Sequence, residues 1–288
     1  MYKKACGIIE TLAPLHTGAT SGEESGNLNL IFRDQFTQTG IIPGSSIRGR
    51  LRSEMRLAQK FAEKNGETQE QDEASYWYGR GNEQSRQKNI NYESIVKIEH
   101  ASVVWLPVFC PGQPIVWVSC PRLLERYGRI AGIEAKLPKP YTGSPKLRGR
   151  KLKQKKKKNK QKEVIFFNLG FLTIEHPQKD LSPWFPLHKG LPAVVFDNVD
   201  MGMIHDMALY RQSRVALAEE QKIAADKAFF NTEALPEGTL LAFPLALRPT
   251  EKTWVDWHPL GDDKQGDIYL GGLESIGFGH CYVTLQEV

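Results

Sequence analysis

The sequence predicts an α+β fold with an antiparallel sheet, and three observations lead to this fold class. Short apolar segments that look like strands alternate with few helices, a pattern that favours hairpin-linked strands over repeated βαβ units. One long amphipathic helix follows Pro43. The chain closes with a strand, a glycine-rich loop and a second strand between Ile268 and Val283.

The first strand is expected at residues 2–13. Further strands are expected at 101–109, 114–119, 163–174, 193–196 and 240–247. The Pro-Gly between 101–109 and 114–119 predicts a hairpin or a strand pair. Pro244 indicates an edge strand or a bulge, because proline cannot donate a hydrogen bond to a ladder. Helices are expected at 121–127 and 203–218, whereas residues 65–100 are expected to be loop.

The helix after Pro43-Gly44 is the clearest local signal, with Ser45 or Ser46 as the expected N-cap. One buried face is predicted by apolar residues three or four positions apart, namely Ile47, Leu51, Met55, Ala58 and Ala62. A second, basic stripe has arginine at every fourth position: Arg48, Arg52 and Arg56. Gly49 weakens a helix by about 1 kcal/mol relative to alanine. Close approach of another backbone is one reason to keep a glycine there.

The composition is that of an ordinary soluble globular protein, with 40% hydrophobic and 25% charged residues. No apolar run approaches the roughly 18 residues of a membrane span, so no membrane association is expected. The basic start lacks the apolar stretch of a signal peptide, and the expected location is the cytoplasm. Four distant cysteines without a C-x-x-C pair imply neither a zinc site nor a disulfide framework. They are expected to be small buried residues: Cys6, Cys110, Cys120 and Cys281.

The positive charge is concentrated in one segment. Residues 146–162 hold 11 Lys and Arg and no acidic residue. Subtracting these 11 from the 38 basic residues leaves 27 against 33 acidic ones, so the rest of the chain carries −6. Such a block indicates a polyanion partner, a solvated loop, or a solvated loop that becomes ordered when nucleic acid neutralises it. With the proline-rich stretch before it, residues 132–163 are expected to form a basic, mobile insertion.

Three segments together resemble the signature of the RAMP superfamily: PLHTGATSG at 14–22, IFRDQFTQTGIIPGSSIRGRLRSEM at 31–55 and GGLESIGFG at 271–279. In that family an early Leu-His-x-Gly loop is followed by an Ile-Pro-Gly-Ser-Ser helix start, and a glycine-rich loop closes the domain. The centre, SVVWLPVFCPGQPIVWVSCPRLLERY at 102–127, is similar to the Cmr-four branch of the Cas-seven family. A looser similarity covers LPEGTLLAFPL at 235–245.

The resemblance implies one RAMP domain over 1–288, with a ferredoxin-like (RRM-like) core, a thumb-like insertion and a glycine-rich C-terminal loop. It also implies a guide-binding (crRNA-binding) backbone subunit of a type III CRISPR RNA-targeting effector in antiviral defence. The implied partners are the crRNA, a complementary target RNA, and other Cas-seven-type, Cas-five-type and large Cas-ten-type subunits. An unrelated α+β protein with a solvated lysine-rich loop is the remaining alternative.

Catalysis is where the chain departs from the family pattern. Type III relatives usually cut target RNA with an Asp in the loop after the first strand, and the matched position is Leu28, six residues before Asp34. An alkyl side chain can neither act as a base nor hold a metal. We therefore expect no catalytic residue and no cofactor. The alternative is a metal-dependent endoribonuclease that uses Asp34 or Glu24, with Mg²⁺ as its cofactor.

The expected RNA-binding residues fall into four groups. A Gly-Ser-Ser helix start offers backbone N–H groups and a positive dipole end to a phosphate, and arginine can add bidentate hydrogen bonds. Without the resemblance, an ordinary N-cap with a solvated helix face explains the same residues. The groups are the helix start with Ser45, Ser46, Arg48, Arg50 and Arg52; Arg33; the glycines Gly271, Gly272, Gly277 and Gly279; and the lysines Lys155, Lys156, Lys157 and Lys158.

Two further motifs have an open role. His16 is expected to make a structural hydrogen bond rather than act as a general base, since no acidic partner is placed with it. The aromatic run Tyr76-Trp77-Tyr78 fits base stacking, and equally fits a core or a subunit interface.

Overall fold

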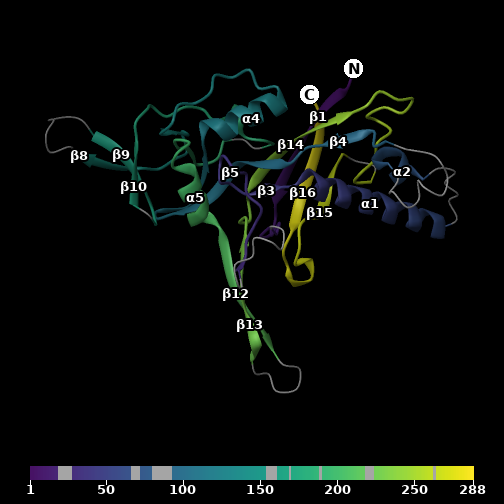
Figure 1. Cartoon of the computed structure of the whole chain (residues 1–288). Coiled ribbons are helices and arrows are strands. Elements are labelled where there is room, and N and C mark those ends of the chain that lie inside the picture. The colour runs from purple at the N-terminus through teal and green to yellow at the C-terminus, as the bar shows by residue number, and fades with distance from the viewer. Residues whose placement is uncertain are drawn as a thin grey trace.

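The computed structural model describes residues 1–18, 28–65, 72–79, 93–153, 161–168, 170–187, 190–217, 224–261 and 264–288. In this part of the chain a ten-stranded sheet carries helices on its faces, and two three-stranded sheets flank it (Figure 1). One of these small sheets contains a long hairpin that projects away from the body (Figure 1). The α+β class with an antiparallel sheet is confirmed, because all described pairs of the large sheet are antiparallel except β6 with β11.

The elements have the following bounds. Along the large sheet the order is β15 (Gln265–Tyr269), β16 (His280–Glu287), β1 (Lys3–Thr11), β14 (Leu240–Leu247), β5 (Ala101–Cys110), β6 (Gln113–Ser119), β11 (Ala193–Val195) and β7 (Thr142–Gly143), with β3 (Ile41–Ile42) on β5 and β4 (Val96–Ile98) on β14. The small sheets are β10 (Gly170–Ile174), β9 (Gln161–Phe167) and β8 (Arg150–Lys153), and β12 (Tyr210–Leu217), β13 (Ala224–Ala234) and β2 (Leu28–Asn29). The α-helices are α1 (Gly44–Lys64), α2 (Glu73–Tyr78), α4 (Pro121–Ala131) and α5 (Met201–Ala208), and the 3₁₀ helices are η1 (Ser182–Trp184) and η2 (Glu274–Ile276).

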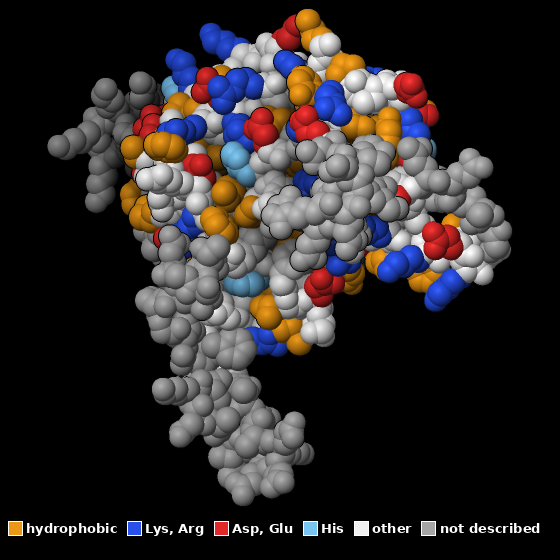
Figure 2. Space-filling model, turned by 45° about the vertical axis from the view of Figure 1, so that its right-hand side comes forward, with side chains coloured by type: hydrophobic (Ala, Val, Ile, Leu, Met, Phe, Trp, Pro, Cys, Tyr) orange, Lys and Arg blue, Asp and Glu red, His pale blue; other side chains and the backbone are white. Residues whose placement is uncertain are grey.

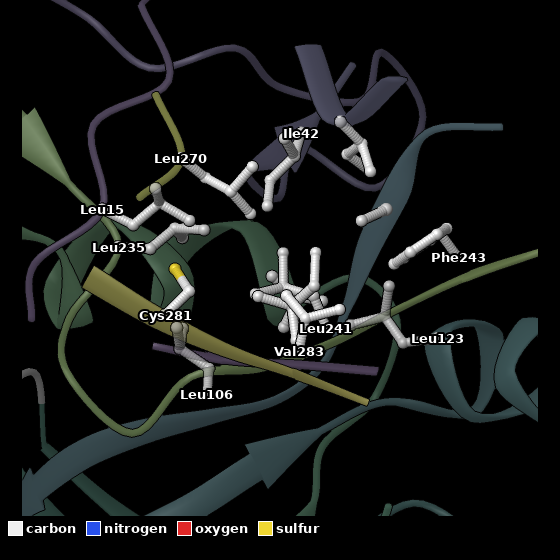
Figure 3. Close-up of a cluster of buried hydrophobic side chains, with 14 of the residues drawn as sticks. Leu15, Ile42, Leu106, Leu123, Leu235, Leu241, Phe243, Leu270, Cys281 and Val283 are labelled. Carbon is white, nitrogen blue, oxygen red and sulfur yellow. The ribbon is translucent and has the colours of Figure 1, made fainter. Parts of the chain in front are cut away.

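The large sheet buries side chains on both of its faces. Alternate residues of β1 point to opposite sides, so Ala5 and Ile9 join the core under α1, while Cys6 and Ile8 join a second core under α4. The first core also takes Leu15 and Leu270 from the loops around the sheet (Figure 3). All four cysteines are buried free thiols, as expected.

Gly7 on β1 shows how tightly the first core is packed. Its register partner is Phe243, and a Cβ built on Gly7 would lie 2.1 Å from the Phe243 ring. Because Phe243 is fully buried, the ring has no free space to move into. The glycine therefore makes room for an aromatic ring across the strand pair.

Helix α1 buries the first part of the predicted face, with Ile47, Leu51 and Met55 in the core. The rest of the predicted face is not buried, since Ala58 is exposed and Ala62 is half-buried. The N-cap of α1 differs from the expectation: the cap residue is Pro43, and no side chain caps the helix. The Pro43 carbonyl accepts hydrogen bonds from the N–H groups of Ser46 (3.0 Å) and Ile47 (3.2 Å). The start is fixed by Gly44, where a Cβ would lie 2.5 Å from the Ile98 carbonyl oxygen. The hydroxyl groups of Ser45 and Ser46 are thus not needed as caps.

Pro244 was expected at an edge or a bulge, and this expectation is wrong, because β14 lies between β1 and β5. On its second side, β14 pairs with β5 through Leu240–Ala242 and with β4 through Leu245–Leu247. Pro244 falls where one partner gives way to the other, so its missing N–H interrupts no continuous ladder there.

Four other segments differ from the sequence-based expectation. Residues 163–174 form a hairpin, β9 and β10, instead of one strand. The segment 203–218 is helical only to Ala208 and continues as β12. Within 65–100, α2 and β4 form where a loop was expected. Residues 132–163 contain β7 and β8, which pair with β11 and β9, so the described part of the basic insertion belongs to the fold.

An ion-pair network anchors the base of the β12–β13 hairpin. Glu233 of β13 has a side chain only 7% exposed, and it pairs with Arg33 at 3.0 Å and with Arg211 at 3.1 Å. Arg33 also pairs with Asp206 at the end of α5. A buried carboxylate is tolerated when its charge is matched in this way. The network therefore joins the loop around Arg33, helix α5 and the hairpin.

His205 adds a hydrogen bond near the base of the β12–β13 hairpin. Its side chain is fully buried, and Nε2 accepts a hydrogen bond from the Gly40 N–H at 2.9 Å. Burial lowers the pKa of His205 below 6.5, the effect of Asp206 opposes this, and Arg33 adds to the lowering. A proton on Nε2 would remove the acceptor that Gly40 needs.

We predict that the free energy of unfolding decreases on acidification below about pH 6.5, the ordinary pKa of histidine. A folded-state pKa below the unfolded value means that the unfolded chain binds the proton more readily, so stability is lost as pH falls. The slope from this group is at most about 1.4 kcal/mol per pH unit.

Urea unfolding at pH 7.5, 6.5 and 5.5 measures this slope. His205→Gln keeps an acceptor for Gly40 without a titrating group, and it should flatten the slope. His258→Gln, which changes an exposed histidine, is the matched control and should keep the slope of the unmodified chain. Equal slopes in all three proteins would contradict the assignment.

Candidate nucleic-acid interface

Residues from three distant segments line one cleft of about 680 Å³. The N-terminal loop, the start of α1 and the glycine-rich loop before β16 meet there, and these are the three signature segments of the sequence. The cleft is lined by Thr17, Gly18, Phe32, Pro43, Ser45, Ser46, Gly49, Arg50, Ser53, Tyr269, Gly271, Gly272 and Glu274. Of the expected RNA-binding residues, the structure thus brings Ser45, Ser46, Arg50, Gly271 and Gly272 together.

The glycine-rich loop reaches the N-terminal loop through backbone contacts. The Gly272 N–H donates to the His16 carbonyl at 3.0 Å, and the Gly279 N–H donates to the Pro14 carbonyl at 2.9 Å. Gly271 has φ +78°, and a Cβ there would lie 2.2 Å from the His16 carbonyl oxygen. The two loops can lie this close because Gly271 has no side chain.

The four predicted glycines therefore differ in what they do. Gly271 and Gly279 are needed for packing, since a Cβ on Gly279 would lie 2.3 Å from the Leu270 carbonyl oxygen. At Gly272 and Gly277 a Cβ would meet no atom of the described chain within 4 Å. Gly272 lines the cleft, whereas Gly277 does not.

Apart from Arg50, the residues of α1 that line the cleft are small, and three of the four are serines. Ser45, Ser46 and Gly49 are exposed. A Cβ on Gly49 would meet no atom of the described chain within 4 Å, although Gly49 lies inside the helix. The fold itself does not require a glycine at this position. What the glycine provides is open space directly over the first turns of α1, where the helix dipole is positive.

Arg50 connects the two walls of the cleft. Its Nε lies 2.8 Å from Glu54 on α1, and its Nη1 lies 3.3 Å from Glu274 in the glycine-rich loop. The Arg50 side chain is 28% exposed and that of Glu274 is 44% exposed. An exposed pair of this kind is weak. An incoming phosphate would compete with Glu274 for the guanidinium.

Arg48 and Arg52 do not line the cleft. Arg48 donates to the Tyr78 carbonyl at the end of α2, where a basic side chain satisfies a helix C-terminus. The pKa of Arg52 is lowered by burial, and neighbouring Arg56 and Arg48 lower it further. Of the arginine stripe on α1, Arg48 thus contacts α2, and RNA binding by Arg48 and Arg52 stays a prediction.

Arg33 and Asp34 are both engaged inside the chain. Arg33 belongs to the ion-pair network at the hairpin base, which the sequence could not indicate because its partners are some 170 to 200 positions away. Asp34 is a turn residue whose carboxylate accepts from the N–H groups of Phe36 and Thr37. Burial raises its pKa, but these hydrogen bonds outweigh burial, and the net pKa is lowered.

Some of the predicted residues cannot be placed. Glu24 and the lysines Lys155, Lys156, Lys157 and Lys158 lie outside the described residues. The backbone of Leu28 pairs with Asn231 at the hairpin. Within the part of the chain that the structure describes, no group of three His, Cys, Asp or Glu residues could hold a metal ion.

Two of the three aromatic residues at 76–78 pack inside the protein, which overturns the reading of the run as a stacking platform, whereas Tyr76 is half-buried. Trp77 and Tyr78 are fully buried, and Tyr78 packs against Trp257 with ring centroids 6.4 Å apart. His16 has the expected structural role, with Nδ1 2.7 Å from the Glu233 carbonyl oxygen. Sequence reasoning missed Tyr269, which lines the cleft and stacks on His280, its register partner across β15 and β16.

The described lining of the cleft contains one positive and one negative side chain, Arg50 and Glu274. In Figure 2, which brings the α1 side forward, Lys and Arg side chains lie among Asp and Glu side chains rather than in one continuous basic patch. None of the described helices is long and apolar enough to span a membrane. The chemistry of the cleft rests on local groups: backbone N–H groups, one guanidinium (Arg50), one carboxylate (Glu274), and the hydroxyls of Thr17, Ser45, Ser46, Ser53 and Tyr269.

The chain is similar in sequence and in fold to known proteins. A curated relative, the CRISPR system Cmr endoribonuclease Cmr4 of Pyrococcus furiosus, is 23% identical over 299 residues, which cover 97% of this chain and 95% of the relative. A chain in the cryo-EM structure of the type III-B Cmr-beta apo state has a TM-score of 0.67 and 18% identity, covering 99% of this chain and 97% of that chain. The crystal structure of oligomeric Cmr4 from Pyrococcus furiosus has a TM-score of 0.64 and 17% identity, with 100% of both chains covered.

At such identities the solved structures show a shared fold and nothing more. The sequence profile of the RAMP superfamily, in contrast, matches residues 8–282, which include all three segments that meet at the cleft. The chain belongs to the RAMP superfamily.

Proposed function

We propose that this chain is a guide-RNA-binding backbone subunit of a type III CRISPR effector complex in antiviral defence. Its partners in this proposal are the crRNA, a complementary target RNA, and other Cas-seven-type, Cas-five-type and large Cas-ten-type subunits. The curated relative carries the name of a Cmr subunit, and a structural neighbour is a chain of type III-B Cmr-beta bound to cognate target RNA. Both likenesses support the proposal.

The observation that carries the proposal is the cleft and its chemistry. Exposed Ser45, Ser46 and Gly49 at the start of α1 face the glycine-rich loop with Gly272, and Arg50 lies between them. Backbone N–H groups at a helix start, hydroxyls and a guanidinium suit a phosphate. Contacts of these groups to phosphate carry no sequence information. A cleft of this kind fits the backbone of a guide whose sequence varies.

We further propose that this subunit does not cleave RNA and needs no cofactor. The curated relative is named an endoribonuclease, but the position matched to the catalytic Asp of the family is Leu28. The alternative acid Asp34 already accepts three hydrogen bonds within its own turn, from Phe36 and Thr37. A metal-dependent nuclease that uses Glu24 with Mg²⁺ is the second candidate.

Gly49→Ala separates stability from binding. Alanine is favoured over glycine in a helix by about 1 kcal/mol, and a Cβ here meets no atom of the described chain. We therefore expect a higher free energy of unfolding together with weaker RNA binding, because the methyl group would enter the space over α1. Thermal unfolding and titration of a labelled guide by fluorescence anisotropy measure the two quantities. The opposite pattern, lower stability with unchanged binding, would show that the glycine serves the fold.

Arg50 and Glu274 should shift RNA affinity in opposite directions. Arg50→Ala removes a charged hydrogen bond to phosphate and should weaken guide binding by about 1–3 kcal/mol. Glu274→Gln removes the competing carboxylate and should strengthen binding, since Arg50 is then available to the phosphate. Arg56→Ala, an exposed arginine of α1 outside the cleft, controls for net charge. RNA affinity is measured for each variant from binding isotherms at two salt concentrations. If Glu274→Gln changes the affinity by no more than the charge control Arg56→Ala does, the result argues against the cleft.

Cleavage is tested in the assembled complex with guide RNA, complementary target RNA and Mg²⁺. Mapping of the cut sites should show no cut beside this subunit, because the matched position has no carboxylate. Leu28→Asp should create one. If the unmodified complex cuts there, and the cut is lost in Glu24→Ala or Asp34→Ala while RNA binding persists, the subunit is a nuclease.

A further inference from the structure

The small sheet β10–β9–β8 has a buried face and an outward face. Ile165 and Ile174 join the main core, and Phe167 of the same face packs on Phe196 with ring centroids 5.6 Å apart. These contacts fix the sheet to the body of the protein. Figure 1 shows that this sheet and α1 lie at opposite sides of the molecule.

The outward face carries two phenylalanines and an arginine. Phe166 stands directly opposite Phe171 in the β9–β10 register, and Arg150 stands opposite Val164, which is two residues before Phe166. Since side chains alternate along a strand, these residues share one face. The two rings are 6.3 Å apart, and the Arg150 guanidinium lies 5.8 Å from the Phe166 ring centroid. Phe171 is 66% exposed.

The sequence around this face is strongly basic. Eleven Lys and Arg residues without any acidic residue occupy positions 146–162, which include β8 and the start of β9. Glu163 follows this window, and it accepts a hydrogen bond from the Gly149 N–H at 3.0 Å. The exposed Phe171 ring and the half-buried Phe166 ring, with Arg150 beside them, match a partner that combines flat apolar rings with negative charge.

We propose that the outward face of β8–β10 binds single-stranded RNA by stacking unpaired bases on Phe171 and Phe166, with Arg150 beside them. Single-stranded nucleic acid is held by this combination of aromatic rings and positive charge on a sheet. A duplex keeps its bases stacked on each other and cannot offer them to the rings. A protein partner for two phenylalanines would have to neutralise the same basic segment, which RNA does with its own phosphates. This surface is separate from the α1 cleft, and its RNA binding does not depend on the guide-binding proposal.

The test uses a labelled 12-nucleotide single strand that contains 2-aminopurine, a base whose fluorescence falls on stacking. Phe171→Ala should weaken binding about tenfold and abolish the fluorescence decrease that the protein causes. Phe171→Trp should restore both. Phe61→Ala, which removes a similarly exposed ring (64%) from α1, is the matched control and should change neither quantity. A duplex of the same length should bind equally to the unmodified chain and to Phe171→Ala.

Combination with the cleft variant separates the two RNA surfaces. The Phe171→Ala effect should be equally large in the Arg50→Ala background, because distant and independent sites contribute additively. If Phe171→Ala no longer weakens RNA binding in the Arg50→Ala background, the two residues belong to one site and the proposal is overturned. Unchanged affinity and fluorescence in Phe171→Ala would also overturn it, and so would an effect of the variant on subunit assembly alone, which would identify a protein interface.

Discussion

The close contact between the N-terminal loop and the glycine-rich C-terminal loop is the constraint on which the rest of the site depends. It requires a glycine at position 271, where a Cβ would overlap the His16 carbonyl, and it is closed by hydrogen bonds from Gly272 and Gly279. The central position of β1, between β14 and β16, brings the two loops to the same end of the sheet. Helix α1 then supplies the second wall of the cleft.

The balance of charge in the cleft follows from this geometry. Because the glycine-rich loop is held in place, Glu274 stands within reach of Arg50, and Glu54 holds the same guanidinium from the helix. The cation is therefore positioned but shared between two carboxylates. Affinity for a polyanion then depends on local competition at one arginine and on counterion release, while the net charge of the chain outside residues 146–162 is negative. At the base of the β12–β13 hairpin the ratio of charges is reversed, because the buried carboxylate of Glu233 pairs with two arginines.

The sequence predicts what depends on local pattern and fails where the deciding partner is distant. The buried face of α1, the strands β1, β5 and β6, and the closing strand–loop–strand follow from spacing and turn chemistry. The meeting of the three signature segments at one cleft was not predicted, because it depends on contacts between residues far apart in the chain. Pro244 was misjudged because two separate strands share one side of β14. Arg48 was expected at the RNA site, but it binds the end of a helix about 30 positions away in the sequence. Trp77 and Tyr78 lie within a polar stretch of the sequence, residues 65–100, yet tertiary packing buries both side chains.

Amide hydrogen exchange with and without bound guide RNA tests the cleft most directly, because it reports on the backbone groups to which the phosphates are assigned. Addition of guide RNA should slow exchange in peptides that cover the start of α1, residues 44–53, and the glycine-rich loop, residues 269–277. Peptides of the buried strand β14 should be unchanged. Guide RNA bound with saturating affinity, but without protection in either of the two cleft segments, would contradict the cleft as the guide-binding site.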